Sequence, residues 1–163
     1  MPIRLFRIDD RLIHGQVVVG WAQALGLQLI VLVDDAVAEA DWERELYAVA
    51  VPRGIELRFE TVAGAVAHFA DYGRDAREGM LVTRDVATMG ALQSQIAGIA
   101  AVHIGGLHYG LGRAQKLRYV FLDADDETRL RALAAHGVAV TAQDLPTARA
   151  VALEDILDGR GGE

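Results

Sequence analysis

The chain has 163 residues, of which 24% are charged and 52% apolar, which fits one compact domain. Its formal charge of -7 argues against nonspecific binding to nucleic acid or to an anionic membrane. The absence of cysteine excludes disulfides, thiolate metal sites and cysteine nucleophiles.

The first predicted elements alternate between strand and helix. Residues 3–8 are apolar and β-branched and run into a charged loop, which predicts a strand. A helix follows, because apolar residues recur at helical spacing at Val18, Trp21, Ala22 and Leu25. Gly26 is placed to end this helix in a left-handed conformation. The unbroken apolar run 29–33 predicts a strand covered on both faces.

The same alternation continues through the middle of the chain. Trp42, Leu46 and Val49 predict a second helix, and a turn follows at residues 52–54. The next strand is indicated by apolar residues with a period of two, at Ile55, Leu57 and Phe59. Thr61 can cap a third helix that Gly73 ends.

Four more strands are predicted, at residues 80–83, 101–104, 119–122 and 138–141. Between the last two, Asp125 begins a helix that Gly137 ends. Its inward residues are expected to be Leu130, Leu133 and Ala134, and Glu127 is expected to pair with Arg131.

This order predicts an α/β fold with an open, mostly parallel sheet of about seven strands and helices on both faces. No internal repeat or Pro/Ser-rich linker appears, so one domain is expected over residues 1–157, with a flexible tail over 158–163. The N-terminus lacks the pattern of a secretory signal, and no apolar run approaches the ~20 residues that span a bilayer. We therefore expect a soluble cytoplasmic protein.

In an open parallel sheet, ligands bind beyond the carboxyl ends of the strands. Three predicted loops should therefore face one edge. The polar and glycine residues of these loops are Asp9, Asp10, Arg11 and His14 after the first strand, Asp34 and Asp35 after the second, and Gly105, Gly106, His108, Gly110, Gly112 and Arg113 after the fifth.

The densest group is DDRLIHGQ, residues 9–16, directly before a helix. Histidine is largely uncharged at neutral pH, so His14 can act as a nucleophile or base. Backbone N–H groups around residues 15–17 favour an anion beside it, and Arg11 adds a cation suited to phosphate or carboxylate. Asp10 could orient the imidazole or hold Arg11. The group indicates phosphoryl chemistry on histidine.

Two other interpretations of these residues stand beside this one. His14 could be a structural polar residue at a helix start, with Asp10 and Arg11 forming a surface pair. A glycosidase-like pair drawn from the aspartates of the first two loops is disfavoured, because adjacent residues at a strand end point apart.

The remaining histidines carry weaker predictions. The segment 103–113 lacks the order of a nucleotide-binding loop, so its glycines are expected to allow close backbone approach. His103 ends an apolar strand and is expected to be buried and hydrogen-bonded, whereas His108 could contact a ligand. These two lack a third metal ligand, so no metal site is predicted. His68 and His136 are expected to be structural.

The motif DDRLIHGQ after an IRxxRI-type strand resembles the IIB component of the mannose, fructose and sorbose family of the bacterial phosphoenolpyruvate-dependent sugar phosphotransferase system (PTS). The resemblance continues in order through VDDAVA (33–38), VPRGIEL (51–57), HIGG (103–106), GLGR (110–113), VFLDADDE (120–127) and GVAVTAQDLP (137–146). The chain departs from the family pattern at residues 107–109 and 141–143.

The resemblance implies a phosphoryl carrier with the mostly parallel sheet predicted above. By position, His14 would take a phosphoryl group from a IIA phosphohistidine and give it to a sugar held by the membrane components IIC and IID. The residues that would bind or orient the group are Asp10, Arg11, Gly15, Gln16, Asp35, Gly105 and Gly106. No cofactor or metal is implied.

Partners follow from the same resemblance. Arg7, Arg11 and Arg113 could form a local positive surface that contacts IIA, and the protein would visit the inner face of the membrane. A homo-oligomer stays open. Two alternatives stay open as well: a regulatory phosphohistidine carrier that transports no sugar, and a module that binds a small anion or sugar without covalent chemistry.

Overall fold

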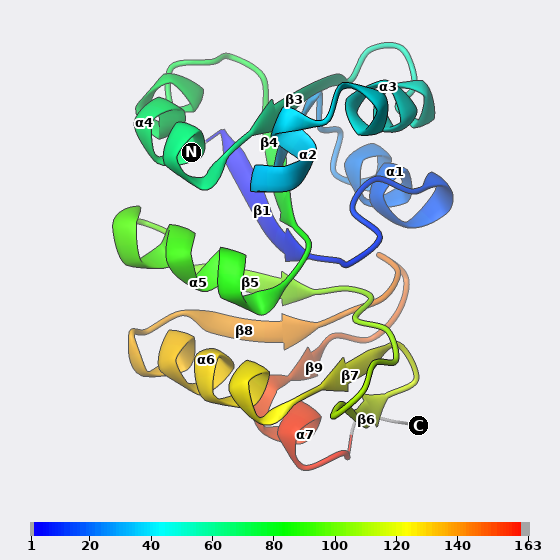
Figure 1. The fold of residues 1–163 in the computed structure, drawn as a ribbon, viewed down its shortest axis with the longest axis vertical. Coiled ribbons are helices and arrows are strands. Elements are labelled where there is room, and N and C mark those ends of the chain that lie inside the picture. Colours follow the sequence, from blue (N-terminus) through cyan, green and yellow to red (C-terminus); the bar gives the residue numbers. More distant parts are fainter. Residues whose placement is uncertain (1, 161–163) are drawn as a thin grey trace.

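The computed structural model describes residues 2–160, apart from the side chains of residues 16 and 17. Strands and helices alternate along this part of the chain (Figure 1). The elements in order are β1 (Ile3–Ile8), α1 (Gly15–Ala24), β2 (Leu29–Val33), α2 (Asp35–Glu39), α3 (Asp41–Ala50), β3 (Glu56–Glu60), α4 (Val62–Tyr72), β4 (Gly79–Thr83), α5 (Val86–Gln95), β5 (Ala101–Ile104), β6 (Ala114–Leu117), β7 (Val120–Leu122), α6 (Ala124–Ala135), β8 (Ala139–Ala142), β9 (Val151–Ala152) and α7 (Leu153–Leu157).

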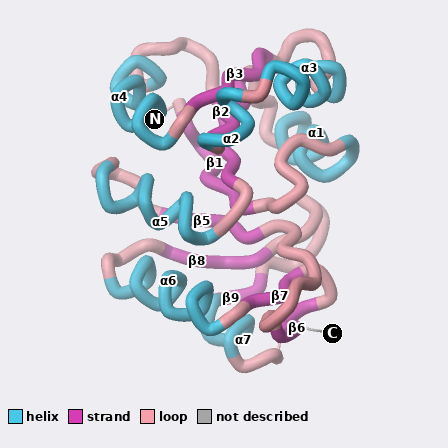
Figure 2. Tube along the Cα trace, in the orientation of Figure 1, coloured by secondary structure: helices cyan, strands magenta, loops and turns pink. Residues whose placement is uncertain are grey.

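The main sheet of the described residues has seven strands in the order β3-β2-β4-β1-β5-β8-β9. All neighbours in it are parallel except β8 and β9. Two apolar cores cover its faces, and Figure 2 shows the strands flanked by helices. Helices α1, α2 and α3 pack on one face, and α4, α5, α6 and α7 pack on the other. The predicted fold class is confirmed.

One predicted strand does not belong to the main sheet, although that sheet has seven strands as predicted. β7 lies within predicted strand 119–122, but it pairs antiparallel with β6 in a separate two-stranded hairpin. The seventh place in the main sheet is taken by β9, which has two residues and is too short to show a period. Helices α2, α5 and α7 were not predicted either. α2 and α7 have five residues each.

The predicted helix ends are mostly confirmed. Gly26 and Gly137 have φ of +66° and +85°, and Thr61 Oγ1 accepts a hydrogen bond from the N–H of Gly64 at 2.9 Å. Gly73 follows α4 as predicted but keeps a right-handed φ of -63°.

The prediction for α6 was wrong in three details. Its N-cap is Asp123, whose carboxylate accepts a hydrogen bond from the N–H of Asp126 at 2.7 Å. Ala134 is exposed, because the inward stripe is narrow. Glu127 forms an ion pair with Lys116 of the hairpin at 2.8 Å and makes none with Arg131 among the described residues.

The predicted tail begins where α7 ends. In residues 158–160, the N–H of Arg160 still donates to the carbonyl of Asp155 at 2.8 Å. Residues 161–163 lie outside the described part of the chain.

Candidate functional site

The loop after β1 leaves the sheet where the strand order reverses. β1 lies between β4 and β5, and its loop stays joined to both. The N–H of Asp9 donates to the carbonyl of Thr83 at 2.9 Å, and the N–H of Asp10 donates to that of Gly106 at 2.9 Å. Ligands of open parallel sheets bind at such a reversal.

Two buried apolar side chains hold this loop in an unusual backbone conformation. Leu12 and Ile13 are buried, and Leu12 has a left-handed φ of +57°, which costs a non-glycine residue about 1–2 kcal/mol. The turn places His14 at the N-cap of α1. The His14 side chain is 20% exposed, so a partner can reach its ring.

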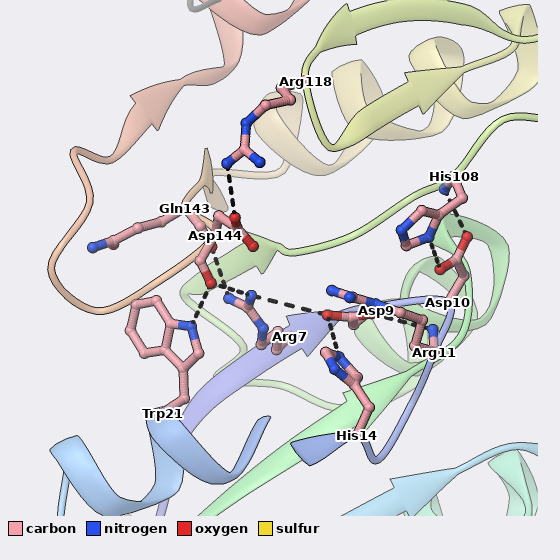
Figure 3. A network of polar contacts seen from close by, with 10 residues as sticks. All are labelled: Arg7, Asp9, Asp10, Arg11, His14, Trp21, His108, Arg118, Gln143 and Asp144. Carbon is pink, nitrogen blue, oxygen red and sulfur yellow. Dashed lines mark hydrogen bonds and ion pairs between the residues drawn. The ribbon is translucent and has the colours of Figure 1, made fainter. Parts of the chain in front are cut away.

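Asp9 is the residue that orients the His14 ring (Figure 3). Its buried carboxylate lies with Oδ2 3.2 Å from Nε2 of His14. The other oxygen, Oδ1, accepts hydrogen bonds from Arg11 through the backbone N–H at 3.1 Å and through Nε at 3.4 Å. The prediction offered Asp10 for orienting the imidazole or for holding Arg11, and Asp9 makes both of these contacts instead. Adjacent residues at the end of an extended strand point to opposite sides, and the sequence does not say which one faces the histidine.

The charge of Asp9 is stabilised by these contacts. Burial favours a raised pKa for Asp9, but the hydrogen bonds and charges of His14 and Arg11 outweigh it and hold the pKa below its ordinary value. Asp9 is therefore a carboxylate at neutral pH, and a carboxylate can only accept from Nε2–H. This fixes the proton of the His14 ring on Nε2.

Asp10 points the other way and holds the loop after β5. Its carboxylate accepts a hydrogen bond from the N–H of His108 at 2.7 Å and lies 2.6 Å from Nδ1 of the same residue. The alternative of an Asp10–Arg11 surface pair is therefore not found: each residue has a different partner.

Gly105 and Gly106 let the two loops approach each other, as predicted for the glycine segment. A Cβ on Gly105 would lie 2.5 Å from Nη2 of Arg7 and 2.8 Å from Oδ2 of Asp9. A Cβ on Gly106 would lie 3.1 Å from Nη2 of Arg11. Any larger residue would displace the charged groups around His14.

Arg7 lies below the site and is 0% exposed. It donates to the carbonyls of Gln143 and Asp144 at 3.0 and 3.1 Å and lies 4.0 Å from Oδ2 of Asp9 (Figure 3). Trp21 of α1 covers its guanidinium at 4.9 Å and donates from Nε1 to the same Asp144 carbonyl at 3.0 Å. The prediction that Arg7 faces a partner is wrong, because these contacts bury it inside the molecule.

The two other predicted arginines differ from each other. Arg11 is partly exposed beside Asp9 and keeps its predicted place next to His14. Arg113 is mostly buried, donates to the carbonyl of Phe121 at 3.4 Å and lies 3.6 Å from Asp126. Its guanidinium therefore joins the hairpin to α6.

The remaining predicted phosphate-binding residues lie in two places. Gly15 is the first residue of α1, directly after His14. Gln16 follows in the helix, and its side chain lies outside the described part of the structure. Asp35 accepts a hydrogen bond from the N–H of Val62 at 2.8 Å, which joins α2 to α4. No recorded contact of the described residues links Asp35 to His14.

The other histidines are placed as follows. His103 is mostly buried, as predicted, but its Nδ1 has no hydrogen-bond partner among the described residues, and its ring lies 6.2 Å from that of Trp21. Burial, and then the charge of Arg7, lower the pKa of His103. His68 pairs with Glu60 at 2.9 Å, and His136 caps the end of α6.

The described residues offer neither a cluster of metal ligands nor a membrane-spanning helix. They contain no group of three or more side chains that could hold a metal ion. None of their helices is long and apolar enough to cross a membrane.

Comparison with known proteins gives consistent matches over almost the whole chain. A family profile described as "PTS system sorbose subfamily IIB component" matches residues 3–162. The N-acetylgalactosamine-specific phosphotransferase enzyme IIB component 1 of Escherichia coli (strain K12) is 34% identical over 145 residues, 88% of this chain and 91% of that protein. The sorbose-specific EIIB component of Klebsiella pneumoniae is 37% identical over 142 residues, 85% of this chain and 84% of that protein.

A solved structure agrees with these matches. The IIBSor domain of the sorbose permease from Klebsiella pneumoniae superposes with a TM-score of 0.90, at 28% identity over 97% of each chain.

Proposed function

Because the chain belongs to the sorbose subfamily of IIB components, the phosphoryl carriers of the sugar phosphotransferase system, we propose that His14 carries the phosphoryl group. A phosphohistidine of the IIA component is the donor. A sugar held by the membrane subunits IIC and IID is the acceptor. The protein acts in the cytoplasm and visits the inner face of the membrane to deliver the group.

The contact between Asp9 and Nε2 of His14 carries this proposal, because it selects the reacting nitrogen. With the proton fixed on Nε2, the lone pair of Nδ1 is left free to attack. A group on Nδ1 lies near the backbone, since this nitrogen is next to the ring carbon that joins the side chain. It is therefore close to the N-terminal amides of α1, which favour an anion.

The first transfer needs little rearrangement of the ring. Nδ1 attacks the phosphorus of the donor phosphohistidine, the donor N–P bond breaks, and its electron pair returns to the donor imidazole. Nε2 keeps its proton, and Asp9 stabilises the positive charge that the ring gains. Arg11 stabilises the phosphoryl oxygens during this loose, in-line transfer.

The second transfer reverses these roles. An oxygen of the sugar attacks the phosphorus, and the N–P bond to His14 breaks, so Nδ1 regains its lone pair. The hydroxyl proton goes to a base of the subunit that holds the sugar. Sorbose and N-acetylgalactosamine, which appear in the names of two relatives, are the first acceptors to try.

The test is phosphorylation by phosphoenolpyruvate, the upstream phosphotransferase proteins and IIA. We expect an acid-labile, base-stable phosphoryl group on the wild-type chain and none on His14→Ala. His108→Ala, which removes a partly exposed histidine that contacts Asp10, is the matched control and should be labelled. Labelling of His14→Ala at the wild-type level would show that another residue is the carrier.

Phosphorus NMR of the labelled protein identifies the nitrogen. We expect the signal of a phosphoryl group on Nδ1. A signal from Nε2 would contradict the role given to Asp9 and leave the carrier role of His14 intact.

A further inference from the structure

Helix α3 presents an apolar face that the rest of the described chain does not cover. Trp42, Leu46 and Val49 lie on one side of this helix and are 68%, 61% and 87% exposed. The helix packs against the sheet through Tyr47 and the turn through Val51, so these three side chains point outward. Three large exposed apolar residues at helical spacing mark an interaction surface.

A groove joins this face to the site. Helices α1 and α3 lie side by side (Figure 1), and a groove of about 550 Å³ runs between them, lined on the α3 side by residues 49–52. On the α1 side the lining residues are Gly15, Val19, Gly20 and Gln23. Gly15 follows His14 directly, so the groove gives one of the proteins that dock at His14 a path from the site to α3. We name the groove, together with Trp42, Leu46 and Val49, the α3 surface.

The charge around the α3 surface is negative. Residues 35–53 contain five carboxylates, at Asp35, Glu39, Asp41, Glu43 and Glu45, and two arginines, at Arg44 and Arg53. Arg84 adds a third cation 3.9 Å from Glu43, so carboxylates still outnumber cations by five to three. Arg44 is already bound to the carboxylate of Asp41 and the carbonyl of Ala38. An apolar surface with acidic borders fits a partner whose contact segments are apolar and basic, and it repels anionic lipid.

Of the two partners, IIA and the membrane subunits, the membrane subunits are expected to present apolar and basic segments. The cytoplasmic loops of membrane proteins carry an excess of Lys and Arg, so a membrane-embedded subunit presents basic segments to the cytoplasm. The donor arrives with an anionic phosphoryl group instead. Arg11, beside Asp9, and Arg118, beside Asp144, are 39% and 81% exposed and can contact an anionic group.

We propose that the α3 surface docks the basic cytoplasmic loops of the membrane subunits that hold the sugar. The inference rests on the proposed carrier function, because only a phosphoryl carrier binds a donor and an acceptor in turn. It gives α3 a role in the second transfer only.

The test measures the two transfers separately with a triple variant, Trp42→Ala, Leu46→Ala and Val49→Ala. All three residues are exposed, so the fold should be retained, as circular dichroism and thermal unfolding will show. The first measurement is the rate of phosphorylation by IIA. The second is phosphoryl transfer from the phosphorylated protein to sugar in membrane vesicles that contain IIC and IID.

We expect the first rate to be unchanged. The concentration of phosphorylated protein that half-saturates the vesicles should rise about tenfold, because exposed aromatic and aliphatic anchors carry much of the binding energy of an interface. Glu45→Lys should also raise this half-saturating concentration, because it reverses one acidic charge without removing an apolar contact. The control variant, Tyr109→Ala with Leu111→Ala, removes exposed apolar residues from the loop after β5 and should leave the second transfer unchanged.

Three results would overturn the inference. A loss confined to the first transfer would make α3 a donor surface, and no loss in either transfer would remove its role. Dissociation of a wild-type dimer by the triple variant, seen by sedimentation, would assign the surface to a second copy of the chain. A wild-type chain that is not phosphorylated at all refutes the carrier function itself, which is a different outcome from these three.

Discussion

A buried carboxylate beside an imidazole decides which ring nitrogen keeps its proton, and Asp9 does this for His14. The sequence motif brings His14 and Arg11 into one loop, where both contact Asp9, but it could not separate Asp9 from Asp10. Arg7 was misassigned for a related reason. Arginine is almost never fully buried unless it is paired, and its partners here are the carbonyls of Gln143 and Asp144, 136 and 137 residues away along the chain.

Asp9→Asn removes the negative charge at almost constant shape. The amide can still accept from Nε2–H, but it stabilises the charge of the phosphorylated ring less. We expect the rate of His14 phosphorylation to fall about 10²-fold, the scale of a lost electrostatic contact in a transition state. Single-turnover measurements with phosphorylated IIA will check this. For Asp10→Asn, which weakens the contact with His108, the phosphorylation rate should fall far less. A larger fall for Asp10→Asn than for Asp9→Asn would assign the orientation of the His14 ring to Asp10.

At the scale of elements, apolar runs and periodicity predicted the strands that carry the site. β1, β2 and β4 are buried strands whose hydrophobic runs are unambiguous. Strand β6 and the two-residue β9 were missed because they are short and show no clear apolar pattern. Strand β7 was predicted but assigned to the wrong sheet, because tertiary context decides where a short strand pairs. The outward direction of Trp42, Leu46 and Val49 was also not visible, since an apolar stripe at helical spacing looks the same in a core and in an interface.

Gly105→Ala tests the close approach of two of these loops. The added methyl group would meet Arg7 and Asp9 at less than 3 Å, so the loops must separate. We expect a loss of about 1–3 kcal/mol of unfolding free energy, together with slower phosphorylation of His14. Gly90→Ala in α5, where a Cβ meets nothing within 4 Å, is the control and should be neutral or stabilising in denaturant unfolding. Equal stability of the two variants would show that the loops have room to move.

At the scale of the whole molecule, one network joins the site to distant parts of the chain. Arg7, Trp21 and Arg118 all converge on Asp144 (Figure 3), so β1, α1 and the hairpin are tied to the segment after β8. His103 lies against this network, next to Trp21, with its pKa lowered by burial and by Arg7.

The lowered pKa of His103 predicts how stability depends on pH. Below the ordinary value of 6.5, the unfolded chain binds a proton that the folded chain resists, so the unfolding free energy falls as the pH drops. The loss develops from about pH 6.5 down to the folded pKa and amounts to about 1.4 kcal/mol per unit of lowering. His103→Gln should flatten the stability curve in this window, as measured by denaturant unfolding at several pH values. His136→Gln, at an exposed position, should leave the stability curve unchanged. A curve for His103→Gln as steep as that of the wild type would refute the assignment of this pH dependence to His103.

The central position of β1 has a consequence for the newly made protein. The strand that carries the His14 loop is synthesised before its two neighbours, which end at Thr83 and Ile104. Arg7 finds its carbonyl partners only at residues 143 and 144. Pairing over such sequence distances is slow and comes late in folding. A growing chain therefore cannot complete the network around the His14 loop until residues 143 and 144 have left the ribosome. If His14 is the carrier, as proposed, an incomplete chain would take no phosphoryl group from the donor.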